Sequence, residues 1–80
     1  MRKIGTMIVS ETQWGITGGQ VADIEQTAFG PRHVVLMFSG EFEKIDQIND
    51  ENHKGIGWRI ATPTDTARAR RYAAVSENSR

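Results

Sequence analysis

The sequence of 80 residues contains no cysteine. Without thiols the chain can form neither a disulfide nor a Cys-ligated zinc site, and small secreted domains usually depend on one of these cross-links. A domain of this size buries only about 60% of the surface that its unfolded chain exposes, so its stability is small. We therefore expect an intracellular, cytoplasmic protein. Part of its core can come from a homo-oligomer or from a bound partner.

Long hydrophobic runs are also missing. The longest apolar run is Val34–Phe38, five residues, whereas a membrane span needs about 20. Near the N-terminus, Met7–Val9 is too short for the apolar core of a signal peptide. The sequence therefore predicts no membrane partner.

Recognisable catalytic and cofactor motifs are absent as well. The chain has no Gly-x-Ser-x-Gly elbow, no phosphate-binding Walker loop and no dinucleotide fingerprint. The segment that starts at Asp50 begins like a calcium loop, but Lys54 occupies a ligand position and Ala61 stands where a closing glutamate is needed. We therefore predict a protein that is not an enzyme, with no cofactor and no metal site.

What is present predicts one domain over residues 1–80, of the α+β class. β-branched and aromatic residues indicate strands over residues 3–9, 33–38 and 56–61. A helix is expected from about Pro63 to about Ser76, with Thr62 as its N-cap and Asp65 completing a capping box. The expected fold is a small, mainly antiparallel sheet of three or four strands, with this C-terminal helix packed on it. Residues 76–80 are predicted to form a frayed tail.

Two segments are harder to interpret. Residues 20–29 fit either a helix or a strand that forms a hairpin with residues 33–38, and the hairpin is slightly favoured. In residues 41–53, Phe42, Ile45 and Ile48 recur at steps of three, which favours a short helix. If residues 20–29 are helical, the order becomes βαβαβα. The glycine-rich residues 12–19 are expected to form turns.

The net charge of zero conceals an asymmetry along the chain. Residues 1–10 contain two basic side chains, a charge of +2. Residues 11–51 contain eight acidic and two basic side chains, a charge of −6. Residues 52–80 contain six basic and two acidic side chains, a charge of +4. One of these poles can meet a partner of opposite charge.

Our leading hypothesis is a small non-enzymatic regulator that binds another protein. It would act as an inhibitor or adaptor, as many accessory proteins of phages and mobile elements do, and occlude its partner with an acidic surface. Trp14, in the glycine-rich passage, is the candidate apolar anchor. The candidate acidic residues are Glu41, Glu43, Asp46, Asp50 and Glu51.

The alternative hypothesis is nucleic-acid binding by the C-terminal helix. Its arginines Arg68, Arg70 and Arg71 are the candidate phosphate ligands. The pI of about 6.7 argues against this alternative, because nucleic-acid-binding domains are commonly basic.

Overall fold

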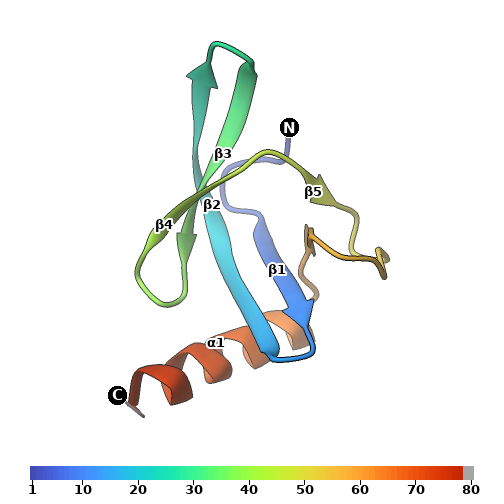
Figure 1. The fold of residues 1–80 in the computed structure, drawn as a ribbon, viewed down its shortest axis with the longest axis vertical. Helices are drawn as coiled ribbons and strands as arrows, with labels where there is room; N and C mark the ends of the chain where they lie inside the picture. Colours follow the sequence, from blue (N-terminus) through green and yellow to red (C-terminus); the bar gives the residue numbers. More distant parts are fainter. Residues whose placement is uncertain (79–80) are drawn as a thin grey trace.

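The computed structural model describes residues 1–78, which form a six-stranded sheet and one helix. This is an α+β fold, as predicted, with more strands than the three or four expected. The helix lies across one end of the sheet, and the β2–β3 hairpin extends toward the other end (Figure 1). The elements are β1 (Met7–Thr12), β2 (Gly15–Thr27), β3 (Gly30–Met37), β4 (Phe42–Ile45), β5 (Ile48–Asn49), β6 (Trp58–Ile60) and α1 (Pro63–Asn78).

The sheet is mainly antiparallel, with the strand order β4-β3-β2-β1-β6-β5. β1 to β4 pair in succession, and β6 pairs antiparallel with β1. Only β5 and β6 pair in parallel. Although β4 and β5 occupy opposite edges, only Asp46 and Gln47 separate them in sequence. A link this short spans roughly 10 Å, so the sheet must curl until its two edges approach each other.

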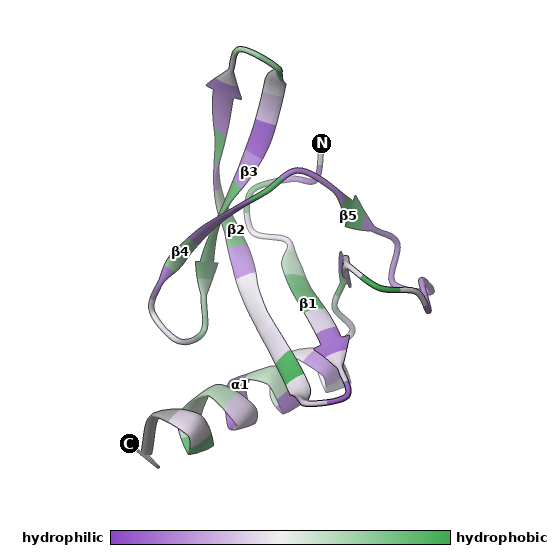
Figure 2. Cartoon of the chain, viewed as in Figure 1, coloured by the Kyte–Doolittle hydropathy of each residue, from purple (hydrophilic) through white to green (hydrophobic). Residues whose placement is uncertain are grey.

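The curled sheet buries side chains on both of its faces. Ile8 and Val9 are neighbours on β1 and point to opposite faces, yet both are fully buried. Ile8 belongs to the cluster inside the curl, whereas Val9 packs with Ile16 and Ala69 under α1. In Figure 2, β1 is hydrophobic over its first half and hydrophilic toward its arrowhead. The buried residues of the inner cluster are Ile8, Val21, Val35, Met37, Ile45 and Ile48.

A buried histidine joins the two edges of the curl. The amide of Arg2 donates to Nε2 of His33 at 3.1 Å, so Nδ1 carries the proton and donates to the carbonyl of Ile45 at 2.8 Å. The guanidinium of Arg2 also donates to the carbonyl of Ile48 at 3.1 Å. Arg2 and His33 therefore connect β3, β4 and β5, and His33 has a structural role.

The helix begins as predicted. The hydroxyl of Thr62 accepts from the amide of Asp65, and the carboxylate of Asp65 accepts from the amide of Thr62, both at 3.1 Å. This is the reciprocal capping box. Burial by itself raises the pKa of Asp65, but the hydrogen bonds of Thr62 and the charge of Arg59 outweigh it. The pKa of Asp65 therefore lies below its ordinary value of 3.8.

We expect Asp65→Asn to lower the free energy of unfolding at pH 7 by about 1–2 kcal/mol, because it removes the negative charge that pairs with Arg59 at 3.0 Å and that accepts from the amide of Thr62. A carboxyl whose pKa is lowered by folding stabilises the protein above its unfolded-state pKa, and this stabilisation disappears as the pH falls through the folded-state value. Urea unfolding of the wild type and of Asp65→Asn should therefore show a difference in the free energy of unfolding that becomes smaller below about pH 4. An equal difference in the free energy of unfolding at pH 2.5 and at pH 7 would contradict the lowered pKa of Asp65 in the folded protein.

Two other expectations are corrected by the structure. Residues 41–53 are not helical, because Ile45 and Ile48 end and begin two different strands. Ile45 and Ile48 are three residues apart because Asp46 and Gln47 form a two-residue link between the strands at the two edges of the sheet. Residues 15–19 belong to β2 and are not turns.

The remaining alternatives are settled by the strand and helix bounds. Residues 20–29 form the predicted hairpin with β3, and with one helix in residues 1–78 the βαβαβα order does not occur. The helix continues through residues 76–78 of the predicted tail, and residues 79 and 80 lie outside the described part. Within residues 1–78 no helix combines the length and the apolar character needed to cross a bilayer.

Candidate protein-binding groove

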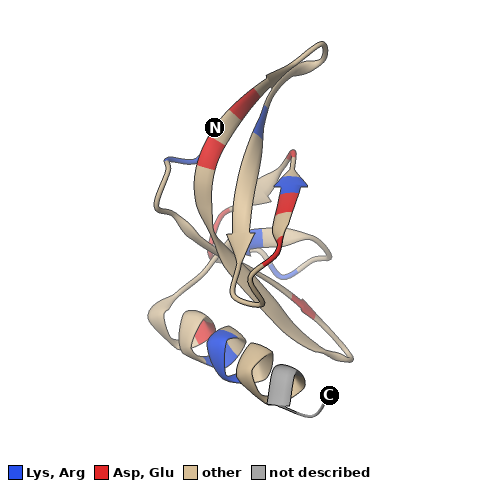
Figure 3. Ribbon diagram, turned by 90° about the vertical axis from the view of Figure 1, so that its left-hand side faces the viewer, with Lys and Arg blue, Asp and Glu red and all other residues tan. Residues whose placement is uncertain are grey.

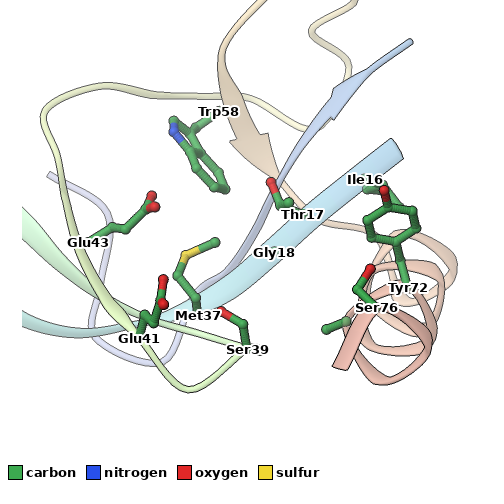
Figure 4. Close-up of a pocket in the computed structure, with 11 residues that line it drawn as sticks. Ile16, Thr17, Gly18, Met37, Ser39, Glu41, Glu43, Trp58, Tyr72 and Ser76 are labelled. Carbon is green, nitrogen blue, oxygen red and sulfur yellow. The ribbon is translucent and has the colours of Figure 1, made fainter. Parts of the chain in front are cut away.

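A groove with a volume of about 300 Å³ opens between the sheet and the helix. Figure 4 shows Glu41 and Glu43 on one side, the helix residues Tyr72 and Ser76 on the other and Met37 between them, with Trp58 above. Five elements and the β3–β4 turn therefore build it. Its lining residues are Ile16, Thr17, Gly18, Met37, Ser39, Glu41, Glu43, Trp58, Tyr72, Ala73 and Ser76.

The floor and the aromatic walls of this groove are apolar and well anchored. Met37 is buried, and Trp58 packs half-buried against the inner core cluster. Tyr72 is held over Gly15, where an added Cβ would lie 2.4 Å from its ring. The hydroxyl of Tyr72 donates to the carbonyl of Trp14 at 2.9 Å. These side chains therefore offer a fixed apolar surface to a ligand.

One wall of the groove carries two carboxylates. Glu43 pairs in register with Val35, so both side chains lie on the inner face of the sheet, and Glu41, in the turn just before β4, lines the same groove. Both glutamates are exposed. Within residues 1–78 neither takes part in a salt bridge. Two negative charges thus border the apolar floor.

The other candidate acidic residues lie elsewhere, and two of them are neutralised. Asp46 accepts two hydrogen bonds from Arg32, at 2.9 and 3.1 Å, and Asp50 pairs with Arg2 at 2.8 Å. Glu51 borders a separate polar hollow beside Arg59. Figure 3 shows acidic and basic residues interspersed over the molecule. The acidic segment of the sequence is therefore not one acidic surface, and only Glu41 and Glu43 reach the groove.

Trp14 is 78% exposed at the β1–β2 turn. Its amide donates to the hydroxyl of Thr12 at 3.2 Å, and its carbonyl accepts from Tyr72. The indole does not line the groove. Its main chain helps to position Tyr72, which does line it.

The candidate arginines are largely engaged within the protein. Arg68 pairs with Glu11 at 2.6 Å, and this hydrogen bond raises the pKa of Arg68 and lowers that of Glu11. Arg70 stacks over the ring of Phe38, 5.0 Å from its centroid. Among the described residues, Arg71 has no salt-bridge partner. The three arginines therefore do not present one free phosphate-binding surface.

The sequence alone did not indicate Met37, Trp58 and Tyr72 as groove residues. Each carries an ordinary core signal, because apolar residues on strands and on a helix face are usually buried. Their convergence depends on pairing between segments far apart in the chain. Only the alternation of Glu41 and Glu43 around Phe42 could have indicated a charged inner face on a strand.

The described residues contain no cluster of histidine, cysteine, aspartate or glutamate suited to a metal ion. Comparisons with protein-family models, with curated proteins and with solved structures find no match. The geometry of the groove therefore carries the functional argument.

Proposed function

We propose that this protein is a non-enzymatic binding protein that holds a basic segment of a partner protein in its groove. By covering that segment it acts as an inhibitor or adaptor. The observation that carries the proposal is the pair Glu41 and Glu43, two exposed carboxylates without salt-bridge partners in residues 1–78, beside the apolar floor.

This combination complements the chemistry of long basic side chains. Lysine and arginine carry a charged group on an aliphatic stem, and the stem packs readily on apolar surface while the charge remains near solvent. Met37 offers such a surface, and Trp58 and Tyr72 add aromatic rings that attract cations. Glu41 and Glu43 would supply the opposite charge. Electrostatic complementarity of this kind gives specificity and fast association.

The rigid setting of the groove also supports a binding role. Its walls come from paired strands and from a capped helix. A preformed site loses little conformational entropy on binding, so more of the contact energy appears as affinity.

The test uses a synthetic peptide, acetyl-Thr-Lys-Val-Lys-Val-Lys-Thr-amide, titrated into the full chain by isothermal calorimetry. We expect Glu41→Gln with Glu43→Gln to weaken binding about tenfold, a loss of about 1.4 kcal/mol. High salt should weaken the wild-type complex, because the charges are exposed. The matched control is Asp23→Asn with Glu51→Gln, which removes the same charge from exposed residues outside the groove. Equal losses in both double variants, or no binding, would overturn the proposal.

A parallel titration with a labelled duplex and a labelled single strand separates the proposal from nucleic-acid binding. We expect no binding of either at physiological salt. Binding that falls with salt and disappears when Arg68, Arg70 and Arg71 become alanine would favour the nucleic-acid hypothesis instead.

A further inference from the structure

The outer edge of β4 has main-chain groups that no strand within residues 1–78 uses. Among these residues, β4 is the terminal strand of the sheet and pairs only with β3. The amide of Met37 donates to the carbonyl of Glu41 at 2.8 Å. Antiparallel ladders alternate, so the main chain of Glu43 also faces β3, at its partner Val35. The N–H and C=O groups of the intervening Phe42 and of Lys44 therefore point away from β3.

This edge is open and borders the groove. Phe42 is 65% exposed, and the side chain of Lys44 is 53% exposed. Glu43, on the inner face of the same strand, and Glu41, in the turn just before it, line the groove. On the outer face, Phe42 pairs in register with the exposed Leu36. Free main-chain groups, two carboxylates and an exposed apolar pair thus lie on β4 and on the residues beside it.

We propose, resting on the function proposed above, that the partner's basic segment binds as an extended strand added to the edge of β4. Its main chain pairs with Phe42 and Lys44. The side chains of an added strand alternate between the two faces. Basic side chains on the inner face meet Glu41 and Glu43, and the apolar side chain between them packs on Phe42. The recognised pattern is therefore basic–apolar–basic.

A second copy of this chain is a poor occupant of the same edge. Antiparallel pairing of two β4 strands centred on Glu43 places two glutamates directly opposite each other. Centring on Lys44 places two lysines opposite each other, and centring on Phe42 places Glu41 opposite Glu43. Like charges directly opposite destabilise a strand pair, and charged edge strands are a known defence against self-pairing. Charge therefore selects a basic strand over a copy of β4.

The decisive variant is Lys44→Pro. Proline removes the outward N–H of residue 44, and edge strands tolerate proline where the N–H faces solvent. The matched control is Lys44→Ala, which loses the same ion pair with Glu25 but keeps the N–H. Circular dichroism and thermal unfolding would establish that both variants fold. We expect Lys44→Pro to weaken binding of the alternating peptide about three- to tenfold relative to Lys44→Ala, the value of one hydrogen bond.

Two further measurements test strand addition. A peptide of the same composition with its lysines in a row, acetyl-Thr-Lys-Lys-Lys-Val-Val-Thr-amide, should bind more weakly than the alternating peptide. Hydrogen exchange followed by NMR should show slower exchange of the Phe42 and Lys44 amides in the complex.

Failure of this inference is distinguishable from failure of the proposed function. Strand addition is wrong if both peptides bind equally, if Lys44→Pro binds as well as Lys44→Ala, and if the amides of Phe42 and Lys44 stay unprotected. The groove proposal stands in that case if the Glu41 and Glu43 double variant still weakens binding. Self-association of the chain alone that Lys44→Pro abolishes would identify a second copy as the occupant and overturn the inference.

Discussion

Replacing His33 with alanine should lower the free energy of unfolding by about 3–5 kcal/mol, the range for large-to-small substitutions in a core. The ring is 2% exposed, and both of its nitrogens are hydrogen-bonded. Alanine leaves a cavity, and it leaves the amide of Arg2 and the carbonyl of Ile45 without these partners. The bonds it removes connect the two edges of the curled sheet, so we expect loss of cooperativity as well as of stability.

Chemical denaturation followed by tryptophan fluorescence would measure this loss. The matched control is His53→Ala, since His53 lies half-buried in the polar turn after β5 and its Nε2 hydrogen-bonds with the carbonyl of Ile56 at 3.3 Å. Its removal should change the free energy of unfolding by no more than about 0.5 kcal/mol. Similar losses in the two variants would show that His33 does not close the sheet.

Replacing Gly18 with alanine should lower the free energy of unfolding by about 1–3 kcal/mol, because it forces the helix away from the sheet. A Cβ at Gly18 would lie 2.9 Å from Cβ of Ala69, 2.9 Å from the carbonyl oxygen of Ile8 and 3.0 Å from the ring of Phe38. The Cβ of Ala69 and the carbonyl oxygen of Ile8 are not the ends of flexible side chains, so the backbone itself must shift. Because Gly18 also lines the groove, peptide binding should weaken with the same substitution.

A double-mutant cycle with Ala69→Gly isolates the contact between sheet and helix. Ala69→Gly costs about 1 kcal/mol through helix propensity, but it removes one atom that the new Cβ would meet. Gly18→Ala should therefore destabilise the Ala69→Gly protein less than the wild type. An identical cost in both backgrounds would mean that the helix does not restrict residue 18.

The groove depends on the closure of the sheet at His33 and on the close packing of sheet and helix at Gly18. β4 and the turn before it supply Glu43 and Glu41, and β6 supplies Trp58. β4 and β6 are not neighbours in the sheet. The curl that His33 stabilises brings them around one opening. Close packing at Gly18 then places Tyr72 at the same opening.

Several elements of this fold follow from short stretches of sequence. The capping box at Thr62 and Asp65 marks the start of α1 because its hydrogen bonds join residues three apart. β-branched residues in 33–38 indicate β3, and the Gly30–Pro31 passage supports a hairpin before it. Each of these signals acts within a few residues, so neighbouring residues suffice to predict it.

Other features depend on contacts between distant segments. In residues 41–53 the spacing of Phe42, Ile45 and Ile48 resembles a helix, and only pairing with β3 and β6 makes these residues strands. Likewise, the acidic segment carries a net charge that composition reveals, but Arg32 and Arg2 neutralise Asp46 and Asp50 across the fold.

The sequence by itself therefore determined the class of the fold, the hairpin that precedes residues 33–38 and the helix with its cap. Only the tertiary structure decided which charges remain unpaired and which residues surround the groove. The physical reason is that propensity, capping and alternation act over a few residues, whereas ion pairing and groove formation depend on where a curled sheet brings distant strands.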